Sequence, residues 1–234
     1  MSVTAAQGFR AAGVRAGLKA SGKPDLALVV NDGPLDTAAG VFTTNRVVAA
    51  PVVWSRRLLA GPEGGQAGHA RAVVLNSGSA NACTGAQGMH DTEATATRTA
   101  GLLGAEPGQI LVCSTGVIGE RIDMPVLLEG VDVAALALAD TPQAGTDAAT
   151  AIMTTDTVSK EDALTVGAGE QSWTIGGMIK GVGMLAPGLA TMLAVITTDA
   201  VLTPQQAQDA LTSATMRTVN RINSDGCMST NDTV

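Results

Sequence analysis

The apolar residues of this chain are gathered in short runs, and the length of these runs limits the fold more than any other feature of the sequence. The runs cover residues 26–30, 40–43, 72–75, 110–113, 173–179 and 192–197. Each has the length of a β-strand, and none approaches the roughly 20 apolar residues that a membrane-spanning helix needs. Stretches of helical character separate the runs, so the sequence predicts a mixed α/β fold built in layers.

Helices are expected at residues 91–103, 123–138 and 141–153, and after Thr203. Asp123 is a typical N-cap residue, and Pro125 follows it in the first turn. The clearest helix start is Thr203, because Pro204 then occupies the first helical position and Gln206 the third, which is the pattern of a capping box.

The composition limits what the core can contain. Aromatic residues make up only 2% of the chain and Tyr is absent, so the core must be built from Ala, Val, Leu, Ile and Met. The cysteines, Cys83, Cys113 and Cys227, are widely spaced and form no CxxC pair, which predicts neither a zinc site nor disulfides. We expect each cysteine to be a small buried hydrophobe, and the protein to need no metal.

The charge and the first residues exclude some classes of partner. The formal net charge is -7 at pH 7, so no basic surplus is available to neutralise the phosphates of a nucleic acid. Residues 1–22 lack the uninterrupted apolar core of a signal peptide. We therefore expect a cytoplasmic protein that binds neither nucleic acid nor membranes.

Two glycine-rich segments imitate cofactor-binding loops but fail on their context. Residues 17–24 follow the phosphate-loop pattern until Pro24, which replaces the hydroxyl residue that binds Mg²⁺. Residues 181–186 read GxGxxA, but a Pro-Gly pair and a strand-like run follow where a dinucleotide site needs a helix. The two histidines, His69 and His90, are most simply solvated side chains. The sequence therefore predicts no cofactor.

The segment 180–199 carries the chemistry that the chain offers. A loop rich in Gly and Pro leads to a small residue, Ala190, and a hydroxyl residue, Thr191, and an apolar strand follows. A strained turn can bring the Thr191 hydroxyl onto the Ala190 carbonyl carbon, so that the chain cleaves itself there. The new α-amine can then act as base for its own hydroxyl without any histidine. On local chemistry alone, a β-branched residue at a strand start explains Thr191 more simply.

Several motifs together favour Thr191 as a nucleophile over Thr191 as an ordinary strand residue. Segment 180–199 resembles the processing site of the ornithine acetyltransferase family, also called the bifunctional glutamate N-acetyltransferase family. Other motifs of the family match in the same order, at residues 17–22 with 25–28, 39–45, 76–85, 114–119 and 151–156, and at Asp225 with 229–232. The resemblance covers essentially the whole chain, and it implies the α/β fold of the family, a layered sandwich of mixed sheets flanked by helices.

The resemblance assigns roles to particular residues. Thr191 matches the nucleophile, and Ala190–Thr191 matches the scissile bond. Thr115 and Gly116 match the residues that stabilise the oxyanion, and a hydroxyl with a backbone N–H suits that task chemically. Residues 76–85 match without an assigned chemistry, and their Gly and Asn content fits a structural turn near the site.

The resemblance also implies the substrates and the reaction. Lys180 and Thr154 match substrate-binding positions, and an ammonium suits the carboxylate of an amino acid. Without the family, Lys180 would be interpreted as a solvated lysine and Thr154 as a helix-end hydroxyl. The implied reaction is ping-pong acetyl transfer in arginine biosynthesis, from N-acetylornithine to Thr191 and then to glutamate. Some members of the family also use acetyl-CoA.

Members of the family continue well beyond the position of Val234, and that part carries further substrate-binding residues. The resemblance makes residues 1–190 an α chain and 191–234 the beginning of a β chain, in a heterotetramer of two α and two β chains. Two other hypotheses remain open. One is a related self-processing aminopeptidase or amidohydrolase that passes the acyl group to water. The other is a non-catalytic small-molecule binding domain in which Thr191 never cleaves.

Overall fold

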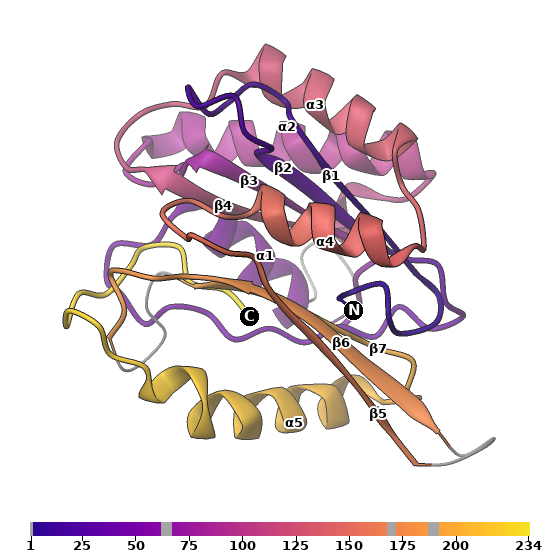
Figure 1. Cartoon of the computed structure of the whole chain (residues 1–234). Coiled ribbons are helices and arrows are strands. Elements are labelled where there is room, and N and C mark those ends of the chain that lie inside the picture. The colour runs from indigo at the N-terminus through magenta and orange to yellow at the C-terminus, as the bar shows by residue number, and fades with distance from the viewer. Residues whose placement is uncertain (1, 62–66, 168–171, 187–191) are drawn as a thin grey trace.

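The computed structural model describes residues 2–61, 67–167, 172–186 and 192–234, in which two β-sheets and several helices are stacked in layers (Figure 1). The first sheet has the order β1-β2-β3-β4, with antiparallel pairs except for the parallel pair of β3 and β4. Its strands are β1 (Phe9–Val14), β2 (Leu26–Asn31), β3 (Ala72–Ser79) and β4 (Ile110–Val117).

The second sheet is antiparallel throughout, with the order β5-β6-β7. Its strands are β5 (Lys160–Val166), β6 (Trp173–Lys180) and β7 (Leu193–Thr198). Residues 232–234 continue this sheet beyond β7. Thr233 exchanges backbone hydrogen bonds with Met192 and Ala194 on one side, and Val234 does so with Val41 on the other.

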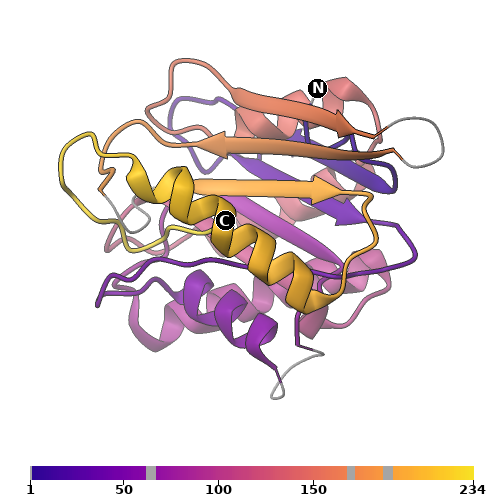
Figure 2. The same cartoon turned by 90° about the horizontal axis from the view of Figure 1, so that it is seen from below.

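The helices are α1 (Ala50–Ala60), α2 (Gly85–Leu103), α3 (Met124–Leu136), α4 (Pro142–Ala151) and α5 (Pro204–Arg217). Helices lie on both outer faces of the pair of sheets, and α4 packs on the inner face of the first sheet, beside the second sheet (Figures 1 and 2). Helices α1, α2 and α3 contribute to one buried cluster with the first sheet, whereas α4 packs against β1 and also meets the second sheet. Helix α5 lies on the far side of the second sheet. The predicted layered α/β fold with mixed sheets and flanking helices is therefore confirmed.

The core is aliphatic, as the composition predicts. One cluster joins α1–α3 to the first sheet through Leu, Val, Ile and Ala side chains, and a second cluster joins the two sheets and α4. Trp54 is the exception in the first cluster, and its indole N–H donates to the Ile110 carbonyl at 2.9 Å. Buried threonines of α2 satisfy their hydroxyls on the preceding turn, as Thr95 does on the Asp91 carbonyl at 2.7 Å.

The predicted helix starts are confirmed by their capping bonds. Asp123 accepts from the Val126 N–H at the start of α3, and Thr203 forms a complete capping box with Gln206 at the start of α5. Residues 17–24 lack the helix that a phosphate loop needs, because strand β2 begins at Leu26. Between residues 181–186 and β7, the residues that the structure describes form no helix. Within the described part of the chain, no helix is both long enough and apolar enough to cross a membrane.

Other expectations were wrong. Residues 40–43 form no strand of full length; Phe42 makes an isolated bridge to Thr233. Of the cysteines, only Cys113 is buried. Cys83 is exposed because it lies in the polar turn before α2, and Cys227 because it lies in a surface loop held by Asp225. All three are free.

Candidate active site

Lys180 and Thr115 meet in the interior, although 65 residues separate them in the sequence. Lys180 ends β6, and its Nζ donates to Thr115 Oγ1 across 3.3 Å. Both side chains are buried, with only 2% of Lys180 exposed to solvent. Because the hydroxyl oxygen of Thr115 accepts this bond, its own proton remains available for another acceptor. Two of the predicted site residues are therefore brought together.

Gly116 occupies a backbone position that other residue types cannot adopt without strain. Its φ is +135°, and it pairs with Gly78 on the neighbouring parallel strand β3. A Cβ at Gly116 would lie 2.3 Å from the Gly78 carbonyl carbon and 2.7 Å from the Ser79 nitrogen. These are backbone atoms that cannot move aside, so the glycine is needed both for its φ and for the close approach of the two strands.

The turn that follows β3 supports this end of β4. Asn76 receives a hydrogen bond from the Ser114 hydroxyl at 2.6 Å and donates to the Ser79 carbonyl at 2.9 Å. Asn81 has a positive φ of 47° and donates to the Gly88 carbonyl in α2. Residues 80–84 thus form a structural turn close to Ser114, as the composition of the motif predicts, whereas residues 76–79 of the same motif belong to β3 and Gly85 begins α2.

Burial controls the charge of Lys180. The loss of water lowers the pKa of this ammonium below its ordinary value, and the carboxylates of Asp156 and Asp232 offset part of that effect. The interpretation of Lys180 as a solvated lysine, which its local sequence alone suggested, is therefore wrong.

Asp156 links the Thr154 loop to the end of β6. Its Oδ1 accepts from the Gly181 N–H at 2.9 Å, and its Oδ2 accepts from the Thr154 N–H at 3.3 Å. Burial raises the pKa of Asp156, but the Lys160 ammonium and these N–H groups outweigh it and hold the pKa below the usual range. The Thr154 side chain itself is exposed, and among the described residues no hydrogen bond joins it to Lys180. The loop, rather than the hydroxyl, is placed beside the site.

Ala190 and Thr191, the predicted scissile pair, lie outside the described residues. The nearest described residues before and after them are buried: Ala186 and Met192 belong to one small cluster with Leu185. Leu193, two positions after Thr191 in the sequence, pairs with Lys180 in the register of β6 and β7.

Two polar residues near the site were not identified from the sequence as site residues. Asn231 donates from Nδ2 to the Ser114 carbonyl at 2.9 Å and to the Ala80 carbonyl at 2.6 Å. Asp232 is fully buried, and its Oδ1 accepts from the Met192 N–H at 2.7 Å. Both lie in the motif at 229–232, so the signal was present in the sequence as adjacent polar residues without an assigned role.

Asp232 is the more unusual of the two. Burial raises its pKa to about 6, although the Met192 N–H and the Lys180 ammonium act in the opposite direction. Its Oδ2 is buried and makes no hydrogen bond of good geometry within the part of the chain that the structure describes. The hydroxyls of Ser229 and Thr43 are near enough to lower its pKa, but Thr43 Oγ1 donates to the Ser229 carbonyl instead.

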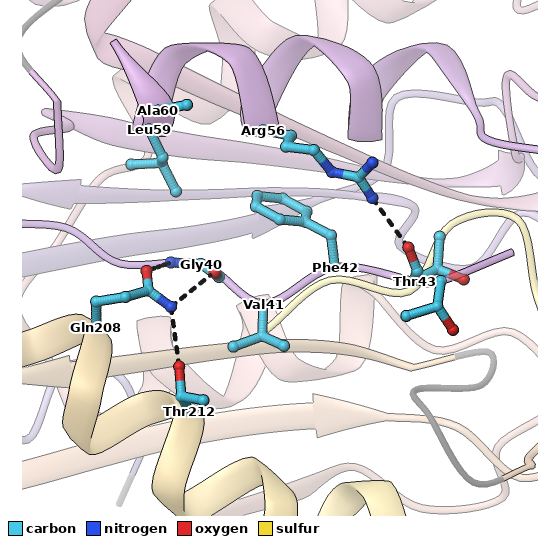
Figure 3. Close-up of a pocket in the computed structure, with 10 residues that line it drawn as sticks. Gly40, Val41, Phe42, Thr43, Arg56, Leu59, Ala60, Gln208 and Thr212 are labelled. Atoms are coloured by element: carbon cyan, nitrogen blue, oxygen red, sulfur yellow. Dashed lines mark hydrogen bonds between the residues drawn. The ribbon is translucent and has the colours of Figure 1, made fainter.

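A surface pocket of about 510 Å³ lies elsewhere, between α1, residues 40–44 and α5 (Figure 3). The Arg56 guanidinium sits over the Phe42 ring, 5.5 Å from its centre, and donates to the Thr43 carbonyl. Gln208 bridges the backbone of Gly40 and the Thr212 hydroxyl. None of the predicted site residues that the structure describes lines this pocket, so the buried contact of Lys180 and Thr115 identifies the candidate site better than the size of a cavity does.

Relatives of known name match the whole chain. The chain is 60% identical over 235 residues to the "Arginine biosynthesis bifunctional protein ArgJ" of Bifidobacterium longum, and 58% identical over 234 residues to the protein of that name from Streptomyces coelicolor. Each alignment covers 100% of this chain and 58% of the relative. The chain thus spans a little over half the length of the relatives that it matches.

Solved structures agree with this. An ornithine acetyltransferase from Mycobacterium tuberculosis, crystallised with ornithine, is 49% identical with a TM-score of 0.74 and covers 82% of this chain and 96% of its own. The ArgJ protein of Bacillus halodurans is 34% identical with a TM-score of 0.73, covering 82% of this chain and 95% of its own. An L-aminopeptidase D-Ala-esterase/amidase from Ochrobactrum anthropi is only 14% identical, with a TM-score of 0.53 over 96% of this chain and 70% of its own, and so shares the fold alone.

The family comparison covers most of the chain. The protein-family model described as "ArgJ family" matches residues 10–234 of the sequence. The resemblance drawn from the ordered motifs is therefore confirmed, and this chain belongs to the ArgJ family.

Proposed function

We propose that this protein is a glutamate N-acetyltransferase of arginine biosynthesis that transfers acetyl from N-acetylornithine to glutamate through Thr191. The observation that supports this most is the buried contact of Lys180 with Thr115, two residues to which the family pattern gives different roles in one site. The register of Lys180 with Leu193 supports it further, because Leu193 follows the proposed nucleophile by two positions.

The first proposed step is self-cleavage between Ala190 and Thr191. The Thr191 hydroxyl attacks the Ala190 carbonyl carbon, the acyl group shifts from nitrogen to oxygen, and water hydrolyses the ester. Residues 1–190 then form the α chain, and Thr191 begins the β chain with a free α-amine. An α-amine has an ordinary pKa of about 7.7–8.0, so near neutral pH it can accept the proton of its own hydroxyl.

The second proposed step is acetyl transfer in two halves. The Thr191 hydroxyl attacks the acetyl carbonyl carbon of N-acetylornithine, and the Thr191 α-amine takes the hydroxyl proton. The bond from that carbon to the ornithine nitrogen then breaks, and the proton passes to the departing ornithine amine. The amine of glutamate then attacks the carbonyl carbon of acetyl-Thr191, and the bond from that carbon to the Thr191 oxygen breaks. The Thr191 α-amine passes the proton lost by the glutamate amine to the Thr191 oxygen, so that N-acetylglutamate leaves and the hydroxyl is restored. The negative oxygen formed in each half accepts from the Thr115 hydroxyl and the Gly116 N–H. The free hydroxyl proton of Thr115 and the fixed backbone of Gly116 support these roles.

Substrate recognition is proposed to come from Lys180 and the Thr154 loop. The Lys180 ammonium binds the α-carboxylate that both substrates share, and the loop that carries Thr154 contributes a polar contact beside it. The complete assembly is proposed to be a heterotetramer of two α and two β chains that works in the cytoplasm.

An assay of ornithine release tests the proposed function. It uses the complete protein that the gene encodes, because the relatives are longer than this chain. With N-acetylornithine alone, release should stop after about one equivalent, and glutamate should restore turnover. Sustained release without glutamate would instead support an aminopeptidase or amidohydrolase that uses water. No release by a chain that stays uncleaved would support a binding domain.

The nucleophile has its own test. Thr191→Ala removes the hydroxyl and should leave a single uncleaved chain without acetyl transfer. Thr191→Ser keeps the hydroxyl but loses the β-branch that restricts its rotamer, so it should cleave slowly and retain some activity. Cleavage of the Ala variant before residue 191 would contradict the assignment.

A further inference from the structure

Asp232 holds the backbone of the residue that follows the proposed nucleophile. Its Oδ1 accepts the Met192 N–H across 2.7 Å, and both residues are buried. An N–H bond to an ionised carboxylate is among the stronger hydrogen bonds in proteins. Met192 is bonded directly to Thr191, so the peptide that links them is fixed at its nitrogen.

The backbone on both sides of Asp232 fixes the same residue again. The Thr233 N–H donates to the Met192 carbonyl at 3.0 Å, and the Ala194 N–H donates to the Thr233 carbonyl at 2.9 Å. On the other edge of the segment 232–234, the Asp232 carbonyl accepts a hydrogen bond from the Thr43 N–H at 2.9 Å. Both the N–H and the C=O of Met192 are therefore held by consecutive residues of one segment.

A purely structural carboxylate would be expected to use both of its oxygens. Asp25 shows that arrangement in the same protein: it is equally buried, and its two oxygens accept from the N–H groups of Ala16, Gly17 and Lys19. Asp232 uses one oxygen on Met192, while the other lies buried without a bond of good geometry among the described residues. The buried Lys180 ammonium also acts on Asp232 electrostatically.

We propose that Asp232 is a positioning residue for self-cleavage and for acetyl transfer, because it fixes the Met192 N–H and so orients the residue bonded to it. This inference rests on the proposed role of Thr191 as nucleophile. Asp232 acts through Met192 and touches no reacting atom itself. Geometry, rather than charge, is what the reaction needs from it.

Three substitutions in the complete protein separate geometry from charge. Asp232→Asn keeps an acceptor oxygen in place and loses the charge, so cleavage should stay within about fivefold of wild type. Asp232→Glu keeps the charge but moves the acceptor by one methylene, and Asp232→Ala removes it. Both should slow cleavage roughly 10- to 100-fold, the range expected for the loss of one charge-assisted hydrogen bond. The time course of the fragments by intact mass gives the rates.

Asp25→Ala is the matched control, since it removes an equally buried carboxylate that bonds a different loop. It should lower the midpoint of thermal unfolding without slowing cleavage. In the processed Asp232→Glu enzyme, kcat for acetyl transfer should fall while KM stays near its wild-type value.

The outcomes also separate this inference from the proposed function. If Asp232→Ala or Asp232→Glu cleaved at the wild-type rate, Asp232 would not position Met192 by geometry. The same conclusion would follow if Asp232→Asn cleaved as slowly as the Ala and Glu variants. In either case the assignment of Thr191 as nucleophile would stand. Cleavage of Thr191→Ala before residue 191 would instead overturn the proposed function whatever the Asp232 variants do.

Discussion

Above pH 6, the protein should be less stable with the buried carboxyl group of Asp232 than with a neutral side chain at position 232. Its pKa is raised to about 6 from an ordinary value of 3.8. Between these two pH values the folded protein binds more protons at this group than the unfolded chain does. The contribution of Asp232 to the free energy of unfolding therefore falls as the pH rises through this window.

The size of the effect follows from the two pKa values. At about 1.4 kcal/mol for each tenfold change in proton affinity, a rise from 3.8 to about 6 corresponds to about 3 kcal/mol. Asp232 is fully buried, so solvent screening does not reduce this figure as it would for a surface group. Asp232→Asn cannot ionise and avoids the cost. The variant should therefore gain on wild type by up to about 3 kcal/mol from pH 4 to pH 6.5 and change little above that.

Urea unfolding at several pH values measures this difference. Both proteins should carry Thr191→Ala, so that each unfolds as one uncleaved chain. The informative quantity is the change with pH of the difference in unfolding free energy, because a constant offset between Asn and protonated Asp cancels from it. A flat difference from pH 4 to pH 7 would show that the carboxyl group ionises without cost. A change in favour of wild type would show that Lys180 more than offsets its burial.

Three other predictions concern the site. Thr115→Ala should lower kcat by roughly 10²–10³ with KM little changed, because one oxyanion donor is lost; steady-state kinetics of the processed variant would contradict this if kcat were normal. Lys180→Met should weaken substrate binding by about 1.5–3 kcal/mol while the fold survives, as measured by calorimetry, and unchanged affinity would remove Lys180 from substrate recognition. Gly116→Ala should destabilise or unfold the protein, because its Cβ would meet the backbone of Gly78. Gly101→Ala in α2, where a Cβ meets nothing within 4 Å, should instead stabilise the protein by about 0.5–1 kcal/mol. Equal midpoints of thermal unfolding for the two variants would refute the steric argument.

Local signals in the sequence predicted much of the fold. Thr203 and Asp123 cap helices through bonds to residues three positions away, so their roles can be inferred from neighbours alone. Strand β5 was missed because its sequence opens with Lys160, Glu161 and Asp162, charged residues that are uncommon in strands and are tolerated here at the edge of the sheet. Helix α1 was missed because its N-cap residue is Ala49, which has no side chain that could cap the helix, although Pro51 lies in the first turn.

The candidate site depends on contacts that no local pattern contains. Lys180 has the sequence context of a surface lysine, and only the packing of the second sheet on the first buries it against Thr115. The family pattern suggested the role proposed for Lys180, and the structure shows its surroundings. Asp232 could be recognised as part of a motif, but its bond to Met192 joins residues 40 positions apart and required the fold. The periodic patterns of a single sequence reveal helices and strands, but they do not show which distant residues are in contact.

The proposal that Thr191 carries the acetyl group can be tested by one measurement on the complete, processed protein. It is incubated with N-acetylornithine in the absence of glutamate, and the fragments are analysed by intact mass and by sequencing of the modified peptide. The account predicts that the fragment beginning at Thr191 gains the mass of one acetyl group on the Thr191 hydroxyl, and that glutamate then removes it. An acetyl group on another residue, or no acetylated fragment while ornithine is still released, would contradict the account.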